Sequence, residues 1–183
     1  MNLDTLKTVN RILFAIPLKP LQGDRFQPTG FPNLGAATYQ TTRGTCLLVE
    51  SAQSMANRME TVCWDEAAQQ PVAPLAGISY VRVERKGRFL TSSMLEAHRI
   101  NSGYIQKAKD DFLKSIEKEI EVEKNLPIDR TKLAKTLFKF DAGALLHGAF
   151  LESIDGRLRV ARSISSFIEA EGVQPVVSGG VKN

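Results

Sequence analysis

The chain has 183 residues, of which 43% are hydrophobic and 24% are charged, so it can bury one sizeable core. Its net charge of +4 is compatible with a nucleic-acid partner but does not require one, because many enzymes are equally basic. No segment reaches the length of a transmembrane helix and the N-terminus lacks a signal-peptide pattern, so we expect a cytoplasmic protein without a membrane partner.

The N-terminal residues predict a helix, a strand and a loop in succession. Apolar residues at positions 3, 6 and 9 favour a short amphipathic helix. Residues 11–18, RILFAIPL, are typical of a strand that Pro17 would confine to an edge or an end. Residues 21–40 contain three glycines and two prolines, which indicates a loop. Within this loop, Phe26 and Phe31 must pack on protein or on a ligand.

A strand and a helix are predicted within residues 45–65, TCLLVESAQSMANRMETVCWD. The run CLLV favours a buried strand, and Ser51 can cap the first turn of a helix over residues 52–63. Apolar residues recur there at three- and four-residue steps, so one face of the helix packs against the protein. The residues expected on this buried face are Ala52, Met55, Ala56, Met59, Val62 and Cys63.

The opposite face of the same helix is polar. An ordinary solvated face explains such a pattern. The other interpretation is a surface that meets a polar or anionic ligand, and the sequence leaves both open. The residues of this face are Gln53, Asn57, Arg58, Glu60 and Thr61.

Residues 78–102 combine strand and helix signals. The alternation in residues 78–84 predicts a strand, and residues 85–88, RKGR, predict a basic turn into a second one. Ser93 and Glu96 have the spacing of a capping box, which predicts a helix from residue 94 to about residue 102.

The central part of the chain predicts a helical lobe. Apolar residues at four-residue steps from Tyr104 to Ile120 favour a long surface helix that Pro127 stops. Asp129 can cap a further helix. We therefore expect a lobe over residues 91–141 inserted between residues 1–90 and residues 142–183. The apolar face of the further helix holds Leu133, Ala134, Leu137 and Phe138.

The C-terminal residues contain a hairpin signal at Asp155-Gly156, followed by a short helix predicted from the apolar spacing over residues 160–168. The last residues, VVSGGVKN, place a Gly-Gly turn directly after a strand-like pair. A fold rarely finishes in this way, so we expect the architecture to continue beyond Asn183.

The sequence gives little support for a catalytic or metal-binding site. Cys46 and Cys63 have apolar neighbours typical of reduced core cysteines, which leaves no activated thiol. The only histidines, His98 and His147, lie far apart in sequence, and each is interpreted as a partly buried structural residue. No phosphate-loop, dinucleotide or nucleophile-elbow motif is present. We predict no catalytic residue, no metal site and no cofactor.

RNA binding requires fewer precisely placed residues than catalysis, and the sequence groups the four kinds of residue that it uses. It uses cations for phosphates, glycines for close approach, aromatics for stacking and amides for base edges or the 2′-hydroxyl. Residues 23–33 supply all four, and the helix at 52–63 and the Gly-Gly turn add more. The candidate RNA-binding residues are Arg25, Gln27, Thr29, Gly30, Asn33, Gln53, Asn57, Arg58 and Lys182.

Six segments in order resemble one known family. They are QGDRFQPTGFPNLGAATY, LLVESAQSMANRMETVCWD, ISYVRV, LTSSMLEAHRINSGYI, ALLHGAFL and SGGVKN. Together they are similar to the RAMP-type backbone subunit of type I-U (I-G) CRISPR effector complexes. The likeness extends over residues 21–183 and is weakest at residues 105–140.

The resemblance implies an α+β fold with an RNA-recognition-motif-like (ferredoxin-like) palm that carries the helical lobe. Residues 1–90 would form the N-terminal part of the palm with the RNA-facing loop, and residues 142–183 the return to the palm. Because members of that family continue well past the SGGVKN motif, part of the palm is expected to be missing. The implied partners are CRISPR guide RNA, other copies of the chain, other effector subunits and, through the complex, target DNA.

Two other hypotheses stay open. A RAMP-like endoribonuclease could use His98 or His147 to process the precursor of the guide, which requires an acid–base group beside the scissile 2′-hydroxyl. A structural subunit that touches only proteins would have an incidental positive charge. Salt dependence of RNA binding separates this last hypothesis from the others, because phosphate contacts weaken as salt is added.

Overall fold

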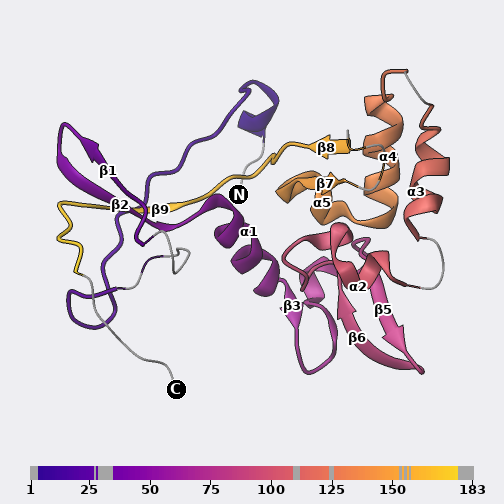
Figure 1. Cartoon of the computed structure of the whole chain (residues 1–183), viewed down its shortest axis with the longest axis horizontal. Helices are drawn as coiled ribbons and strands as arrows, with labels where there is room; N and C mark the ends of the chain where they lie inside the picture. Colours follow the sequence, from indigo (N-terminus) through magenta and orange to yellow (C-terminus); the bar gives the residue numbers. More distant parts are fainter. Residues whose placement is uncertain are drawn as a thin grey trace.

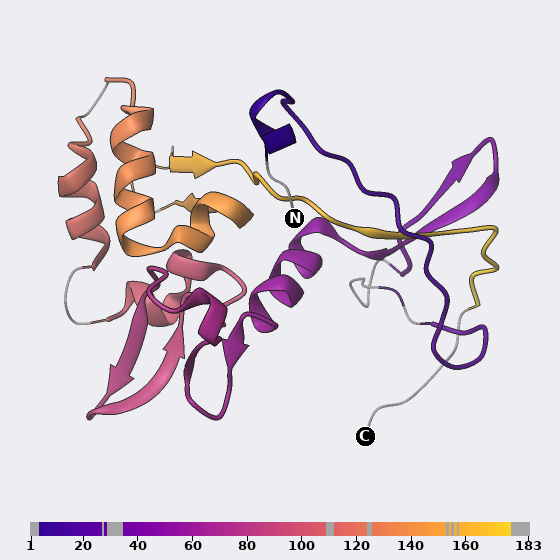
Figure 2. The same ribbon diagram turned by 180° about the vertical axis from the view of Figure 1, so that it is seen from behind.

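The fold mixes helices with small antiparallel sheets (Figure 1). A computed structural model describes residues 4–26, 28, 35–108, 112–123, 126–152, 154, 156 and 158–176. A three-stranded sheet lies at one end of the molecule and helices α3 to α5 at the other, with α1 between them (Figures 1 and 2). Among the described helices, none has both the length and the apolar character that crossing a bilayer demands.

The three-stranded sheet joins distant parts of the chain. Strand β2 (Gly44–Glu50) pairs antiparallel with β1 (Thr38–Thr41) on one side and with β9 (Ile168–Glu171) on the other. The buried strand predicted at residues 46–49 is confirmed, with Cys46 and Leu47 enclosed. The short helix predicted over residues 160–168 is wrong. Ile168 instead begins β9, because its partner strand lies far away in sequence and leaves no local signal.

The N-terminal residues form little regular structure. A single 3₁₀ turn, η1 (Asp4–Lys7), replaces the predicted amphipathic helix. Residues 11–18 form no strand, because no described strand pairs with them, and β-propensity alone does not make one. Leu13 and Phe14 are 82% and 73% exposed. Phe26 is 42% exposed and so only partly packed, whereas Phe31 lies outside the described residues.

Helix α1 (Ala52–Thr61) begins where the sequence predicts. The Ser51 hydroxyl accepts a hydrogen bond from the Ser54 amide at 3.2 Å. The buried side of the helix differs from the prediction, however, because the fully buried residues are Ala56 and Glu60. Met55, Met59 and Cys63 are half-buried, and Val62 is exposed.

Two hairpins follow α1. Strands β3 (Trp64–Asp65) and β4 (Gln70–Pro71) form the first, and the 3₁₀ turn η2 (Ala73–Leu75) leads from it to β5 (Arg82–Arg85) and β6 (Arg88–Ser92). The predicted basic turn is confirmed, although its first strand begins at Arg82 rather than at residue 78. Lys86 and Gly87 both have positive φ, at 53° and 71°, which matches the right-handed twist of a two-residue hairpin.

The helix predicted over residues 94–102 is wrong. The chain there makes turns, the 3₁₀ turn η3 (Arg99–Asn101) and the single-turn helix α2 (Gly103–Gln106). Both residues of the supposed capping box are bonded elsewhere. The Ser93 hydroxyl accepts the Val81 amide at 3.1 Å, and the Glu96 carboxylate accepts the Thr91 and Ser102 hydroxyls at 2.6 and 2.7 Å.

Helices α3 (Phe112–Ile120), α4 (Arg130–Phe140) and α5 (Ala142–His147) form the helical end of the molecule. The single long helix predicted from Tyr104 to Ile120 is wrong, because α2 ends at Gln106 and a turn and a bend follow at residues 107 and 108. Helix α3 ends before Pro127, because Glu121 has the left-handed φ of 55°. The Asp129 cap of α4 is confirmed, since its carboxylate accepts the amides of residues 131 and 132 at 2.8 and 3.1 Å. The predicted apolar face of α4 is partly wrong: Leu133 and Leu137 are buried, whereas Ala134 and Phe138 are exposed.

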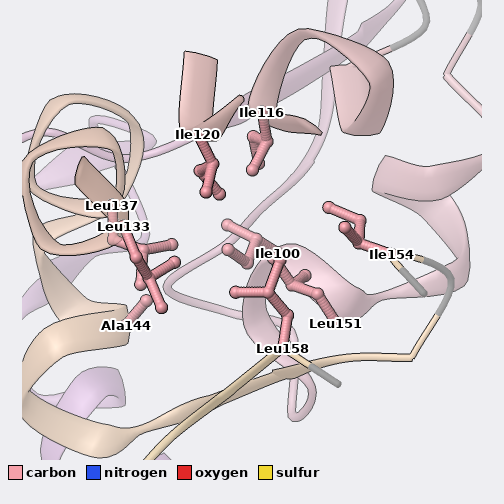
Figure 3. Close-up of a cluster of buried hydrophobic side chains, with 9 residues drawn as sticks. All are labelled: Ile100, Ile116, Ile120, Leu133, Leu137, Ala144, Leu151, Ile154 and Leu158. Carbon is pink, nitrogen blue, oxygen red and sulfur yellow. The ribbon is translucent and has the colours of Figure 1, made fainter. Parts of the chain in front are cut away.

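The main core lies between these helices and a small hairpin (Figure 3). Strands β7 (Ala149–Leu151) and β8 (Leu158–Val160) form that hairpin, which confirms the turn signal around Gly156, although the connection is longer than two residues. The core therefore combines residues from six elements that are scattered along the second half of the chain. It consists of Ile100, Ile116, Ile120, Leu133, Leu137, Ala144, Leu151, Ile154 and Leu158.

Candidate functional site

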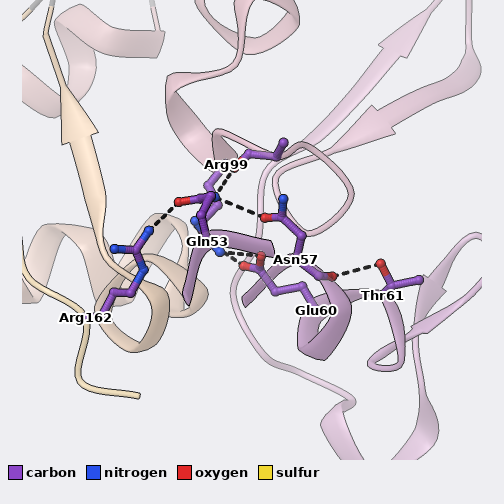
Figure 4. A network of polar contacts seen from close by, with 7 residues as sticks. Gln53, Asn57, Glu60, Thr61, Arg99 and Arg162 are labelled. Atoms are coloured by element: carbon purple, nitrogen blue, oxygen red, sulfur yellow. Dashed lines mark hydrogen bonds and ion pairs between the residues drawn. The ribbon is translucent and has the colours of Figure 1, made fainter. Parts of the chain in front are cut away.

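A buried ion pair joins α1 to the turn η3. The Arg99 guanidinium donates from Nε to Glu60 Oε1 at 2.7 Å and from Nη2 to Glu60 Oε2 at 2.6 Å (Figure 4). Their side chains are only 4% and 6% exposed. Arg99 also has a φ of 51°, a conformation that costs a non-glycine residue about 1–2 kcal/mol. The fold thus tolerates backbone strain in order to hold this guanidinium in place.

A second buried carboxylate, Asp141, lies close to the pair. A Cβ placed on Gly143 would lie 3.0 Å from Asp141 Oδ1 and 3.4 Å from Glu60 Oε1, so glycine leaves room for both. Burial raises the pKa of Glu60 to about 7, against the opposing effect of Arg99. Burial likewise raises the pKa of Asp141 to about 6, against the Ser93 hydroxyl, neighbouring amides and Arg99. The Arg99 guanidinium therefore favours ionisation of two carboxylates, Glu60 and Asp141, whose burial disfavours it.

The raised pKa of Asp141 predicts a pH-dependent contribution to stability. Between its usual value of 3.8 and about 6, folded Asp141 keeps a proton that the unfolded chain has released, so its contribution falls as the pH rises. We expect the unfolding free energy of the wild type, relative to Asp141→Asn, to drop by about 1–3 kcal/mol from pH 4 to pH 7. Urea unfolding across this range measures the difference. The Asp141 charge also raises the pKa of Glu60, so removing it reduces the pH dependence in the same direction, and a constant difference would contradict the prediction.

Gln53 connects α1 to two other segments. Its Nε2 donates to the Ala97 carbonyl at 2.9 Å and to Asn57 Oδ1 at 3.2 Å, while its Oε1 accepts from Arg162 (Figure 4). Arg58, which lies nearby on the helix, donates to the Glu50 carboxylate. The polar face of α1 is therefore largely occupied with contacts inside the protein.

A pocket of about 200 Å³ opens where these segments meet. Its wall includes residues from α1, from the turn at η3, from the end of α5, and from the hairpin β7–β8 and the residues after it. None of the residues that line it is acidic. Its polar and charged lining residues are Gln53, His98, Arg99, Asn101, His147 and Arg162.

His98 and His147 both line this pocket but differ in burial. His98 is exposed, which corrects the prediction that it is partly buried on a helix. His147 is only 7% exposed, and its Nδ1 is buried with no hydrogen-bond partner among the described residues. Burial lowers the pKa of His147, and the charges of Arg99 and Arg162 lower it further. His147 is therefore a neutral imidazole near pH 7.

Gly148 allows the segment of residues 160–162 to lie close to the end of α5 in the pocket wall. Its φ is 78°, and a Cβ there would lie 2.8 Å from the Val160 carbonyl oxygen and 3.2 Å from Arg162 Cγ. Only glycine permits this approach, because the carbonyl is backbone and cannot move aside. The segment that carries Arg162 is thereby held against the end of α5.

A family model described as CRISPR-associated protein GSU0053 matches residues 12–175 of the chain. The chain belongs to this family. Its membership implies a role in CRISPR defence. A search of curated proteins finds no match.

The structure places only some of the residues predicted to bind RNA in this GSU0053-family chain. Arg25 is described and exposed. Gln53 and Asn57 are half-buried and bonded to one another, and Arg58 is exposed but paired with Glu50. Gln53 is the one that lines the pocket. The predicted residues outside the described part of the chain are Gln27, Thr29, Gly30, Asn33 and Lys182.

Of the other polar residues of this GSU0053-family pocket, sequence patterns pointed only to His98 and His147, as the histidines of the endoribonuclease hypothesis. Arg99 and Glu60 are far apart in sequence, and nothing in the local pattern marks either as buried. Arg162 lies in the stretch wrongly predicted to be helical. Within the described residues, no group of three or more histidine, cysteine, aspartate or glutamate side chains could hold a metal ion.

Proposed function

We propose that the chain is a non-catalytic backbone subunit that binds CRISPR guide RNA and assembles along it with further copies of itself. In this proposal the subunit has an RNA-recognition-motif-like palm, contacts other effector subunits and meets target DNA through the complex. Membership in a CRISPR-associated family supports the setting. The basic hairpin β5–β6 supports RNA as the ligand.

The tip of this hairpin carries the proposal. Arg85, Lys86 and Arg88 are exposed, and none of them forms an ion pair with another described residue. Arg85 and Arg88 lie directly opposite one another in the ladder. Like charges in this position destabilise a hairpin, and a polyanion between them removes the repulsion.

Phosphate contacts of this kind suit a guide RNA. They position a nucleic acid without selecting its sequence, which a subunit that carries many different guides requires. Arg25, exposed in the N-terminal segment, is a further cation available for such contacts. The other residues of that loop predicted to bind RNA, Gln27, Thr29, Gly30 and Asn33, lie outside the described residues.

The test removes the three cations at the hairpin tip. Arg85→Ala, Lys86→Ala and Arg88→Ala together are expected to weaken binding of single-stranded RNA and to lower the salt dependence by about 0.7 for each phosphate that the variant no longer neutralises. A fluorescence titration of guide-length RNA at several salt concentrations measures both quantities. The circular dichroism spectrum should stay unchanged, because all three side chains are exposed.

A matched control removes three cations elsewhere. Lys132→Ala, Lys135→Ala and Lys139→Ala on α4 change the net charge equally, and two of these lysines already pair with Glu121 and Glu119. Equal losses from both triple variants would mean that only net charge matters. If neither variant nor the wild type bound RNA in a salt-dependent way, a subunit that contacts only proteins would replace this proposal.

A metal-independent endoribonuclease is the second candidate, because one pocket brings His98 and His147 together. Such an enzyme would use one histidine as a base and another group as an acid. Incubating repeat RNA with the chain separates the two functions. Cleavage products that disappear in the His98→Gln, His147→Gln double variant would favour the enzyme over the scaffold.

A further inference from the structure

The pocket between α1, η3 and the end of α5 differs from the hairpin tip, because it combines arginines with a buried histidine. We propose that it binds one phosphodiester group of single-stranded RNA, with Arg162 and His147 as the principal contacts and Arg99 behind them. This inference rests on the proposed RNA-binding function and adds a second, enclosed contact to it. Three observations carry it: the charge of the lining, the unused ring of His147 and the fixed backbone.

The lining presents cations and neutral groups only. Among the described residues, Arg162 donates to Gln53 through Nη2 and keeps its remaining side-chain donors, and Arg99 donates to Glu60 through Nε and Nη2. The carboxylates that balance this charge, Glu60 and Asp141, do not line the pocket. An anion that enters the pocket therefore meets the exposed Arg162 first, with the buried Arg99 behind it, and a guanidinium fork binds phosphate oxygens in pairs.

The Nδ1 atom of His147 has hydrogen-bonding capacity that no described residue uses. A buried polar atom without a partner is unfavourable, and native proteins rarely retain one without a reason. A small adjustment of the ring would turn an N–H toward a phosphate oxygen in the pocket that it lines. The ring is neutral there, so it recognises the ligand as a donor while the arginines supply the charge.

Two residues of the pocket, Arg99 and Gly148, have backbone conformations that are energetically unfavourable for most residues. Arg99 occupies the left-handed region at φ 51°, and Gly148 at φ 78° allows the segment of Arg162 to approach α5. Gln53 then fastens Arg162 to α1 and to the Ala97 carbonyl. Binding groups held in advance lose less freedom when a ligand arrives, which favours a bound anion over an accidental cluster of cations.

The test uses the fact that the chain contains only two histidines. Long-range ¹H–¹⁵N spectra resolve both rings during a titration with dimethyl phosphate, a simple phosphodiester. We expect the ring signals of His147 to shift in a saturable manner. Arg162→Gln should weaken this binding about tenfold, because it removes a charge-assisted hydrogen bond.

Arg159→Gln is the matched control. Arg159 is three residues away, stacks over Phe150 at 4.4 Å and does not line the pocket, so its variant should bind dimethyl phosphate like the wild type. Absence of a shift in the wild type, or an equal loss in both variants, would overturn the inference whether or not the chain binds RNA.

The second arm uses single-stranded RNA. Arg162→Gln should lower the affinity several-fold and reduce the salt dependence by about 0.7, the value for one phosphate contact on a single strand. If RNA binding depends on the hairpin cations but not on Arg162, the proposed function stands and the pocket site fails. If the wild type binds dimethyl phosphate but no RNA, the proposed function fails, and with it the assignment of the pocket to RNA.

Discussion

Arg99→Ala should lower the free energy of unfolding by about 3–5 kcal/mol, because it leaves the Glu60 carboxylate buried without its partner. This decrease would be larger than for any exposed ion pair of the chain, since solvent cannot screen a charge that the fold encloses. Urea unfolding at pH 7 measures it. Glu60 would partly relieve the penalty by taking up a proton, as its raised pKa of about 7 allows.

Arg58→Ala is the control for this prediction. Arg58 lies on the same helix as Glu60 and pairs with Glu50, which is itself 12% exposed and also accepts from the Ser54 hydroxyl, but the Arg58 side chain is 66% exposed. Its replacement should change stability by no more than about 1 kcal/mol. The double variant Glu60→Ala, Arg99→Ala should be less destabilised than the two single variants predict by addition, because neither charge is then left alone. Similar decreases for Arg99→Ala and Arg58→Ala would contradict the burial of the pair.

The sequence predicted those features of the fold that depend on local chemistry. The caps at Ser51 and Asp129 and the basic turn at residues 85–88 follow from side-chain and backbone groups a few residues apart. Such contacts form wherever the pattern occurs. For the same reason the strand at 46–49 was predictable, since its apolar run has no alternative but burial.

The features that sequence patterns missed depend on distant partners. Glu60 has the spacing of a solvated face, and only Arg99, brought by a turn, makes its burial possible. Residues 11–18 have strand character without a described strand to pair with, and Ser93 and Glu96 match a capping box whose groups bond elsewhere. The same limit applied to the site, where Gln53 was predicted to bind RNA and His147 was considered only for cleavage, whereas Arg162 was not predicted.

Helix α4 offers a direct test of this difference, because Leu137 and Phe138 are adjacent and both were assigned to its apolar face. The structure buries Leu137 completely in the main core and leaves Phe138 67% exposed. Leu137→Ala should therefore cost about 2–5 kcal/mol, through reduced burial and the cavity that remains. Phe138→Ala removes a larger side chain but should cost less than about 1 kcal/mol, as surface substitutions usually do.

Thermal or urea unfolding of both variants decides between the sequence pattern and the structure. If helical periodicity alone set the packing, Phe138→Ala would be the more damaging change, since a phenylalanine buries more area than a leucine. The structure predicts the reverse order, because the core contacts of α4 come from Leu133 and Leu137, next to Ile116 and Ile120 of α3 (Figure 3). A cost above about 2 kcal/mol for Phe138→Ala, the size typical of a core truncation, would place this residue against a surface that the described residues do not provide.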